Sequence, residues 1–258
     1  MSGSDGARPV PPGSAEDPAA VPEGLVSAVV NLVNTGPVEL GAYTVAELTA
    51  VDAIVDFLAA RPSDEVLAEA VRSLAARKLL VAGSTAEQVE VRGDLGIVTA
   101  FQQRARMVLD ARSTGTGPGE PWRILLLPQP EPITMMVRID ALGIHEISLR
   151  KLGEALKLVA TWLPRGRAAD RDARLDADAV LASAERSALV TVTRYTAQGS
   201  AEIAGTSADL VLARHGGQLH AFARDPRDAA KLVPGALGGK DTAEALAGML
   251  AAEANHLQ

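Results

Sequence analysis

The sequence predicts a mixed α/β protein, and three observations support this fold class. Apolar residues recur at helical spacing between about residues 48 and 102. From residue 107 onward, strand-like apolar runs are separated by stretches rich in glycine and proline, which is the pattern of a meander. Two later strand-like runs flank Gly216-Gly217, a two-residue hairpin signal. The chain of 258 residues can bury a sizeable core, and we expect a single domain over residues 24–258.

Residues 1–23 are expected to form a disordered tail. They contain five prolines among glycine, serine, aspartate and alanine, which is too little apolar material to offset the entropy of ordering.

Two consecutive helices are expected after the tail. The first covers residues 47–60, with apolar residues at helical spacing and a stop before Pro62. The second covers residues 63–80, with Ser63 as its N-cap and Gly83 at its end. Its first turn is acidic and its last turn is basic, which suits the helix dipole.

A short strand over residues 89–92 precedes a third predicted helix. Asp94 is the expected cap of that helix, and Leu95, Val98 and Phe101 form its apolar side.

The meander consists of three predicted strands, at residues 107–112, 123–127 and 133–139. The stretches 114–121 and 128–132 between them are rich in glycine and proline and are expected to be loops.

A single apolar stripe from Leu149 to Leu163 predicts a further helix, which ends before Pro164 and covers one sheet face. The next stretch, residues 165–178, is almost purely charged residues and alanine. We expect it to be either a solvated connection or the exposed start of a helix that runs to about Ser187.

The last part of the chain returns to strands. Residues 189–195 alternate as a strand does, and residues 209–215 and 218–224 form the predicted hairpin. Asp241 followed by Glu244 resembles a capping box and predicts a C-terminal helix.

Composition limits the kinds of function that are expected. The 32 acidic and 25 basic residues give a net charge of −7, which disfavours nucleic acid as a partner. There is no cysteine, so disulfides, thiolate catalysis and cysteine-based zinc sites are excluded. The best apolar run, Leu25 to Val33, is interrupted by Ser27 and Asn31 and is too short to span a bilayer. We therefore expect a cytoplasmic protein without a membrane partner.

Three stretches partly resemble known functional motifs, but their sequence context or residue spacing does not match those motifs. The glycines within residues 114–121 lead into a strand rather than a helix, so they do not form a dinucleotide loop. The tract 235–241 lacks the Lys-Ser/Thr pair of a phosphate loop. His145-Glu146 begins a zinc-protease motif, but Leu149 stands where the second histidine is required. We expect no catalytic residues, no cofactor and no metal.

A winged-helix DNA-binding regulator is the alternative function. The two predicted helices and the strand at residues 89–92 fit such a unit, with Arg72, Arg77 and Lys78 facing DNA. Three basic residues on an acidic chain are weak support for this alternative.

Taken in order, the pattern of elements resembles the EspG family of type VII (ESX) secretion-associated chaperones from actinobacteria. Three parts of the chain carry the resemblance. They are AVRSLAARKLLVAG with the following LGIVTAFQQRA and RMVLDAR; RILLLPQPEPITMMVRID with LRKLGEALKLVATWLP; and DLVLARHGGQLHAFAR with DTAEALAGMLAA.

The resemblance implies a central, mostly antiparallel sheet flanked by two helical bundles with approximate internal two-fold similarity. It also implies a non-enzymatic chaperone that keeps helical secretion substrates of the PE–PPE class soluble in the cytosol. A partner helix would dock on a sheet face and an adjacent helical surface.

The expected partner-binding side chains lie on one face of the predicted hairpin, and they are Val211, His215, His220 and Phe222. The two histidines share that face, but no third ligand accompanies them, so a metal site is not expected there. The loop at residues 114–121 and the C-terminal helix are further candidate contact regions.

Overall fold

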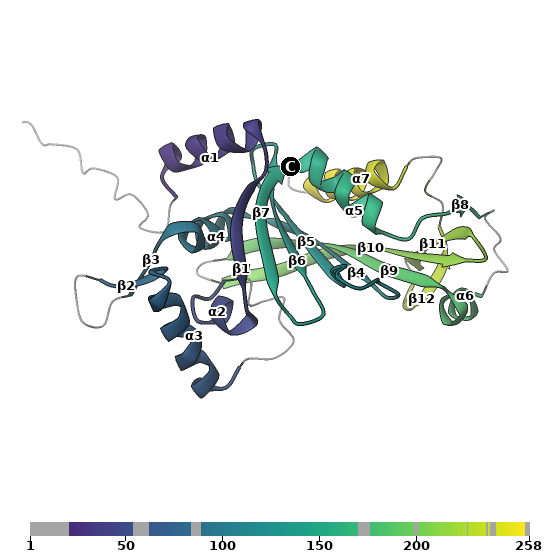
Figure 1. The fold of residues 1–258 in the computed structure, drawn as a ribbon. Helices are drawn as coiled ribbons and strands as arrows, with labels where there is room; N and C mark the ends of the chain where they lie inside the picture. Colours follow the sequence, from purple (N-terminus) through teal and green to yellow (C-terminus); the bar gives the residue numbers. More distant parts are fainter. Residues whose placement is uncertain are drawn as a thin grey trace, which may run out of the picture.

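The computed structural model describes residues 21–53, 62–83, 89–169, 176–198, 201–225, 227–235, 237 and 241–255. Within these ranges, seven helices accompany a ten-stranded sheet and a separate two-stranded one (Figure 1). The predicted α+β class is confirmed, as is the mostly antiparallel character of the sheet.

The helices are α1 (Glu23–Thr35), α2 (Val45–Thr49), α3 (Asp64–Ala76), α4 (Gly93–Arg104), α5 (Leu152–Trp162), α6 (Ala177–Ser183) and α7 (Thr242–Asn255). The strands of the large sheet are β1 (Val38–Tyr43), β4 (Met107–Ser113), β5 (Arg123–Pro128), β6 (Ile133–Ile139), β7 (His145–Lys151), β8 (Arg167–Ala168), β9 (Arg186–Gln198), β10 (Ala201–His215), β11 (Gln218–Asp225) and β12 (Asp228–Pro234). The small sheet pairs β2 (Leu80–Ala82) with β3 (Val89–Val91).

The large sheet has the order β1-β7-β6-β5-β4-β9-β10-β11-β12, and all of these neighbours pair antiparallel. β8 pairs parallel with β11. Within the large sheet, the strands up to residue 151 form one run of neighbours that ends at β4, and the strands after it begin at β9, which pairs with β4. Each half of the chain therefore builds one contiguous half of the sheet.

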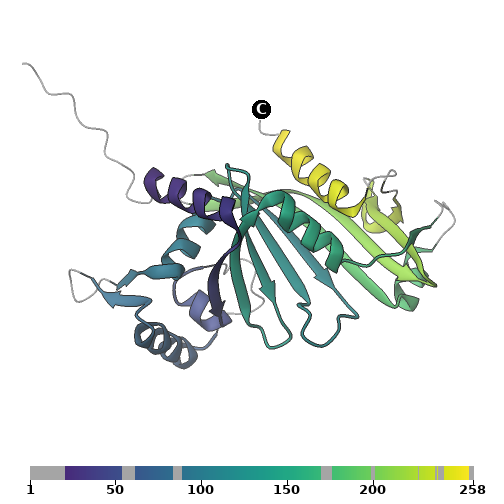
Figure 2. The same cartoon turned by 45° about the horizontal axis from the view of Figure 1, so that its top comes forward.

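The two sheet faces are covered by different helices. The face that carries Leu125 and Leu127, called the first face, packs against α1–α4 at one end. The face that carries Ile124 and Leu126, called the second face, packs against α5 and α7. Figure 2 shows α5 and α7 lying side by side on this second face. α6 covers the first face at its opposite end, over β10 to β12.

The predicted hairpin is confirmed in register and turn. β10 and β11 pair from Leu210 opposite Ala223 to His215 opposite Gln218. Gly216 and Gly217 both have positive φ, of 56° and 75°, which the tight turn requires at both central positions.

The N-terminal elements differ in part from the prediction. Residues 1–20 of the predicted tail lie outside the described residues, and α1 begins at Glu23. α1 and β1 were not predicted as elements. The prediction of a helix over 47–60 is wrong in part: α2 starts earlier and ends at Thr49, and Asp52 in the following turn has a φ of +51°. Residues 54–61 lie outside the described ranges.

The second predicted helix is shorter than expected. α3 begins after Ser63, as predicted, but ends at Ala76 instead of residue 80. Lys78 has a φ of +60°, a conformation that breaks an α-helix, and Leu80 already belongs to β2. α4 begins at Gly93, so Asp94 lies in the first turn rather than at the cap.

The prediction that Leu149 lies in a helix is wrong. It belongs to β7, a strand that was not predicted, and it pairs with Met135 and Val38. The apolar residues of β7 are followed directly by those of α5. The change from strand spacing to helix spacing is therefore hidden in the sequence. The helix itself begins at Leu152.

The charged connection predicted at residues 165–178 contains β8 and the start of α6, while residues 170–175 lie outside the described ranges. Asp176 caps α6 by accepting hydrogen bonds from the backbone nitrogens of Asp178 and Ala179. The helix ends at Ser183 instead of about residue 187, and β9 follows. β12 was not predicted.

Candidate functional site

The middle of the first face lies between the part that packs against α1–α4 and the part that packs against α6, and it carries charged side chains in place of apolar ones. Asp110 accepts two hydrogen bonds from the buried Arg123, at 2.9 Å and 2.8 Å, and two from Arg112, at 3.1 Å and 2.8 Å. The paired contact with Arg123 fixes the carboxylate. Arg112, whose side chain is 51% exposed, therefore brings a surplus positive charge to the surface.

A second charge cluster lies directly beside the first. Asp209 accepts a hydrogen bond from the hydroxyl of Thr191 at 2.9 Å and forms an ion pair with Arg224. Thr191 stands opposite both Asp110 and Asp209 in the sheet register. The polar side chains in the middle of the first face are thus paired with one another, so this strip of the sheet can face water.

A hollow of about 270 Å³ adjoins this strip. Arg112, Leu189 and Val211 stand opposite one another in three adjacent strands, and they line it together with Trp122. Trp122 is 39% exposed, which is high for so large an apolar side chain. The remaining lining residues are Ser113, Thr114, Ser187 and Ala188. We call this feature the sheet-face hollow; it offers an apolar depression with one arginine at its edge.

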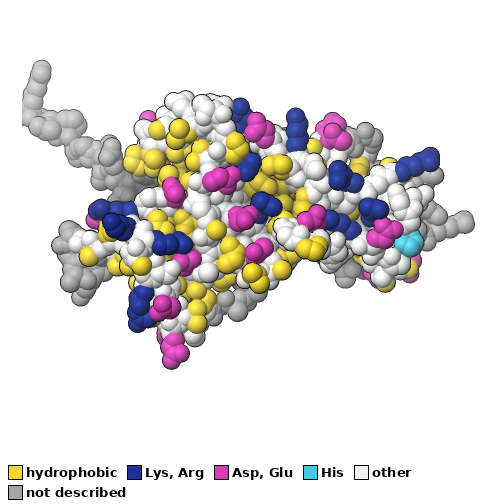
Figure 3. All heavy atoms as spheres, viewed as in Figure 1, with side chains coloured by type: hydrophobic (Ala, Val, Ile, Leu, Met, Phe, Trp, Pro, Cys, Tyr) yellow, Lys and Arg dark blue, Asp and Glu magenta, His cyan; other side chains and the backbone are white. Residues whose placement is uncertain are grey.

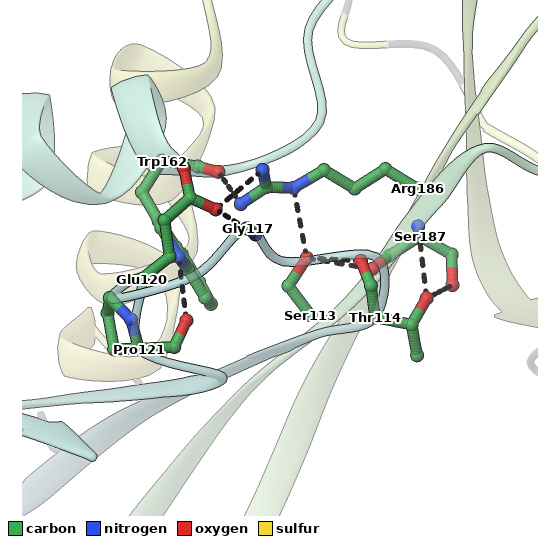
Figure 4. Close-up of polar contacts among 8 residues, drawn as sticks. All are labelled: Ser113, Thr114, Gly117, Glu120, Pro121, Trp162, Arg186 and Ser187. Carbon is green, nitrogen blue, oxygen red and sulfur yellow. Dashed lines mark hydrogen bonds and ion pairs between the residues drawn. The ribbon is translucent and has the colours of Figure 1, made fainter. Parts of the chain in front are cut away.

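The loop at residues 114–121 borders the hollow and is anchored at both of its ends (Figure 4). At the first end, the backbone nitrogen of Thr114 donates to the carbonyl of Ser187 at 2.9 Å, and the two hydroxyls lie 2.8 Å apart. At the other end, the indole nitrogen of Trp162 donates to the carbonyl of Pro121 at 3.0 Å. The loop is therefore tied to β9 and to α5.

Arg186 holds the centre of this arrangement (Figure 4). Its guanidinium donates to Glu120 at 2.9 Å, to the carbonyl of Trp162 at 2.7 Å and to the hydroxyl of Ser113 at 3.3 Å. The backbone N–H of Gly117 donates to Glu120 and, together with Arg186, lowers the pKa of that carboxyl. Glu120 is thus kept ionised and paired.

Gly115 makes the tightest approach in the loop. Its φ is +66°, and a Cβ at this position would lie 2.6 Å from the carbonyl oxygen of Glu185. A side chain would therefore collide with backbone that cannot rotate away. The prediction that these glycines form a turn between two strands is confirmed, since β4 precedes the loop and β5 follows it.

The four predicted partner-binding residues separate into two buried and two accessible ones. Val211 is 9% exposed and Phe222 is fully buried, because both pack with α6 at Ala177 and Val180. His215 is exposed, and its Nδ1 lies 3.2 Å from the carbonyl of Ser183. His220 is half-buried and stacks on Phe222. The common face of the two histidines is as predicted, with His220 opposite Ala213.

The two other candidate contact regions also have definite places. The loop at residues 114–121 reaches the sheet-face hollow through Thr114. α7 turns Leu246 and Leu250 onto the second face, where both are buried.

Trp122 and Arg186 were not predicted as site residues. The scarcity of tryptophan, with two in the whole chain, was the available signal for Trp122.

Two arginines of the winged-helix alternative differ in their surroundings, since Arg72 is exposed and Arg77 contacts neighbouring elements. Arg72 pairs with Glu69 on α3. Arg77 lies 3.6 Å from the buried Glu47 and stacks over the ring of Tyr43. On the face drawn in Figure 3, acidic and basic side chains are interspersed rather than gathered by sign. The contacts of Arg77 join the end of α3 to α2 and to β1.

Among the residues that the structure describes, no group of three or more histidine, aspartate and glutamate side chains is placed to hold a metal ion. In the same part of the chain, no helix has the length and apolar character needed to cross a bilayer.

No protein-family model matches the chain. No curated protein matches it either.

Proposed function

We propose that this protein is a non-enzymatic chaperone or adaptor that binds a helical partner protein in the cytoplasm and keeps it soluble. The observation that carries the proposal is the sheet-face hollow, in which the exposed Trp122 stands beside Leu189 and Val211 on an otherwise polar strip. An amphipathic helix can place an apolar side chain in such a depression.

Charge supports the same proposal. Arg112 lies at the edge of the hollow, and its partner Asp110 is already neutralised by Arg123. An acidic residue next to the apolar side chain of a partner helix would complete this pairing, which favours one orientation of the helix. The resemblance to the EspG family makes a helical hairpin of the PE–PPE class the expected partner.

Substitution of Trp122 tests the proposal. Large aromatic side chains at the centre of an interface typically contribute 2 kcal/mol or more, so Trp122→Ala should weaken partner binding by about 30-fold or more. Binding to a co-expressed PE–PPE-type helical pair is measured by co-purification and titration. Arg112→Glu should weaken the same complex by reversing the charge at the edge.

Leu32→Ala is the matched control, because Leu32 is a 55% exposed leucine on α1, which packs against β7, whereas β4, β9 and β10 line the hollow. Circular dichroism establishes that each variant is folded. Equal binding by Trp122→Ala, Arg112→Glu and the unaltered protein contradicts the proposal.

A further inference from the structure

A cleft of about 480 Å³ lies on the second face, between α5 and the strands β5 to β7. This is the opposite side of the sheet from the sheet-face hollow. Its volume falls within the range of about 300 to 1,000 Å³ that is usual for small-molecule sites. We call it the α5 cleft.

One part of the α5 cleft is apolar. Ile124 and Met136 of the sheet form part of its floor, and Leu158 of α5 stands at its side with 43% of its surface exposed. Pro121 and Trp162 complete the apolar lining. Since the indole N–H of Trp162 is already bonded to the carbonyl of Pro121, this wall offers ring surface rather than a free donor.

The other part carries arginines, and two of them are already paired. Arg138 donates to Glu146 at 3.1 Å. Arg150 donates to Glu39 at 2.9 Å and to the hydroxyl of Ser148 at 3.0 Å. Their charges are balanced within the sheet.

Glu120 and Arg165 decide the net charge of the cleft. Glu120 also lines it, but its carboxylate is bound by Arg186 and by the N–H of Gly117. Arg165 stands just beyond α5, and no carboxylate of the described residues pairs with it. The cleft is left with one uncompensated positive charge beside an apolar wall.

We propose that the α5 cleft binds a small amphipathic carboxylate, with the carboxylate at Arg165 and the acyl body along Leu158, Met136 and Trp162. A single carboxylate balances the charge of Arg165, and an apolar tail removes the exposed surface of Leu158 from water. The additional charges of a multiply charged anion would meet only arginines that are already paired with Glu146 and Glu39.

Titration with octanoate tests this inference, and nuclear magnetic resonance of the protein amides provides the readout. We expect saturable binding with a dissociation constant on the order of 1 mM or tighter. Amide shifts should be confined to α5, the loop at residues 114–121 and the strands β5 to β7. Arg165→Gln should weaken binding about tenfold, the usual contribution of a charge-assisted hydrogen bond.

Two probes separate the contributions of the head and the tail. Octan-1-ol lacks the charge and acetate lacks the tail, so each should bind at least about tenfold more weakly than octanoate. Arg72→Gln is the matched control for Arg165→Gln, because Arg72 is an exposed arginine on α3, remote from the cleft. It should bind octanoate as the unaltered protein does.

Each of the following results overturns the inference. Octanoate fails to saturate the cleft residues, Arg165→Gln binds as tightly as Arg72→Gln, or octan-1-ol and acetate bind as tightly as octanoate. Leu158→Gln provides the second variant, since it removes apolar surface without touching the charge. Weaker binding of octanoate by this variant supports the inference, and unchanged binding contradicts it.

Discussion

At the scale of single residues, His145 shows how burial sets a charge state. It is 1% exposed, its Nδ1 lies 2.9 Å from the carbonyl of Gly143, and its Nε2 has no hydrogen-bond partner within the described part of the chain. Desolvation lowers the pKa of this imidazole, and the nearby Arg123 lowers it further, against an opposing effect of Gly143. His145 is therefore neutral in the folded protein.

This state makes stability depend on pH in a definite direction. Below the ordinary histidine pKa of about 6.5, the unfolded chain binds a proton that folded His145 does not bind, so the free energy of unfolding falls as pH falls. The contribution is complete above about pH 6.5, and it is lost at up to about 1.4 kcal/mol per pH unit until the lowered folded pKa is reached. Urea unfolding between pH 7 and 5 measures this slope.

His145→Gln should reduce that slope, because it removes the buried imidazole. An unchanged slope in His145→Gln would show that another group titrates in this range. Glu120 and Glu131 are carboxyls with lowered pKa values. The stability that their ionised forms contribute is therefore lost only at lower pH.

At the scale of elements, the loop at residues 114–121 depends on one glycine more than on its neighbours. Gly115→Ala should destabilise the protein by about 2 kcal/mol or more, because it adds a backbone collision to the cost of a left-handed conformation. Gly119→Ala is the matched control: its φ is +76°, but no atom lies within 4 Å of the added Cβ. It should cost only about 1 kcal/mol. Chemical unfolding compares the two variants, and equal losses would mean that the approach to Glu185 is not limiting.

The hairpin of β10 and β11 joins the core through α6. Phe222→Ala should destabilise the protein by about 3 to 5 kcal/mol, since Phe222 is fully buried beneath α6. His220→Ala should cost much less, because His220 is half-buried at the margin of that cluster. The thermal unfolding midpoint measures both. A small loss for Phe222→Ala would mean that α6 does not hold the hairpin in solution.

At the scale of the whole molecule, the sequence predicted the elements with clear periodicity and missed those without it. The hairpin and the meander were predicted from the alternation of apolar residues and from the turn residues, including the pairing of His220 with Ala213. β7 was missed because its apolar residues continue without a break into α5. The short edge strand β1, which has a bulge between Glu39 and Gly41, carries little alternation to detect.

The candidate site was less accessible to prediction, because it is made of contacts between distant parts of the chain. The alternation of β10 and β11 identified a face with Val211 and Phe222, but it could not reveal that α6 covers them. Arg186 and Ser113 stand far apart in the sequence and bond only after β9 pairs with β4. Arginine alone gives no signal of such a role.

The division of the sheet into two halves has a consequence for recognition. Arg112 and Trp122 come from the first half of the chain, and Leu189 and Val211 come from the second. The two walls of the sheet-face hollow meet only when β9 has docked on β4. A nascent chain that has formed only the first half of the sheet offers a partner Trp122 and the charged edge, but it lacks the wall formed by Leu189 and Val211. A partner that binds in the hollow thereby selects finished molecules over unfinished ones.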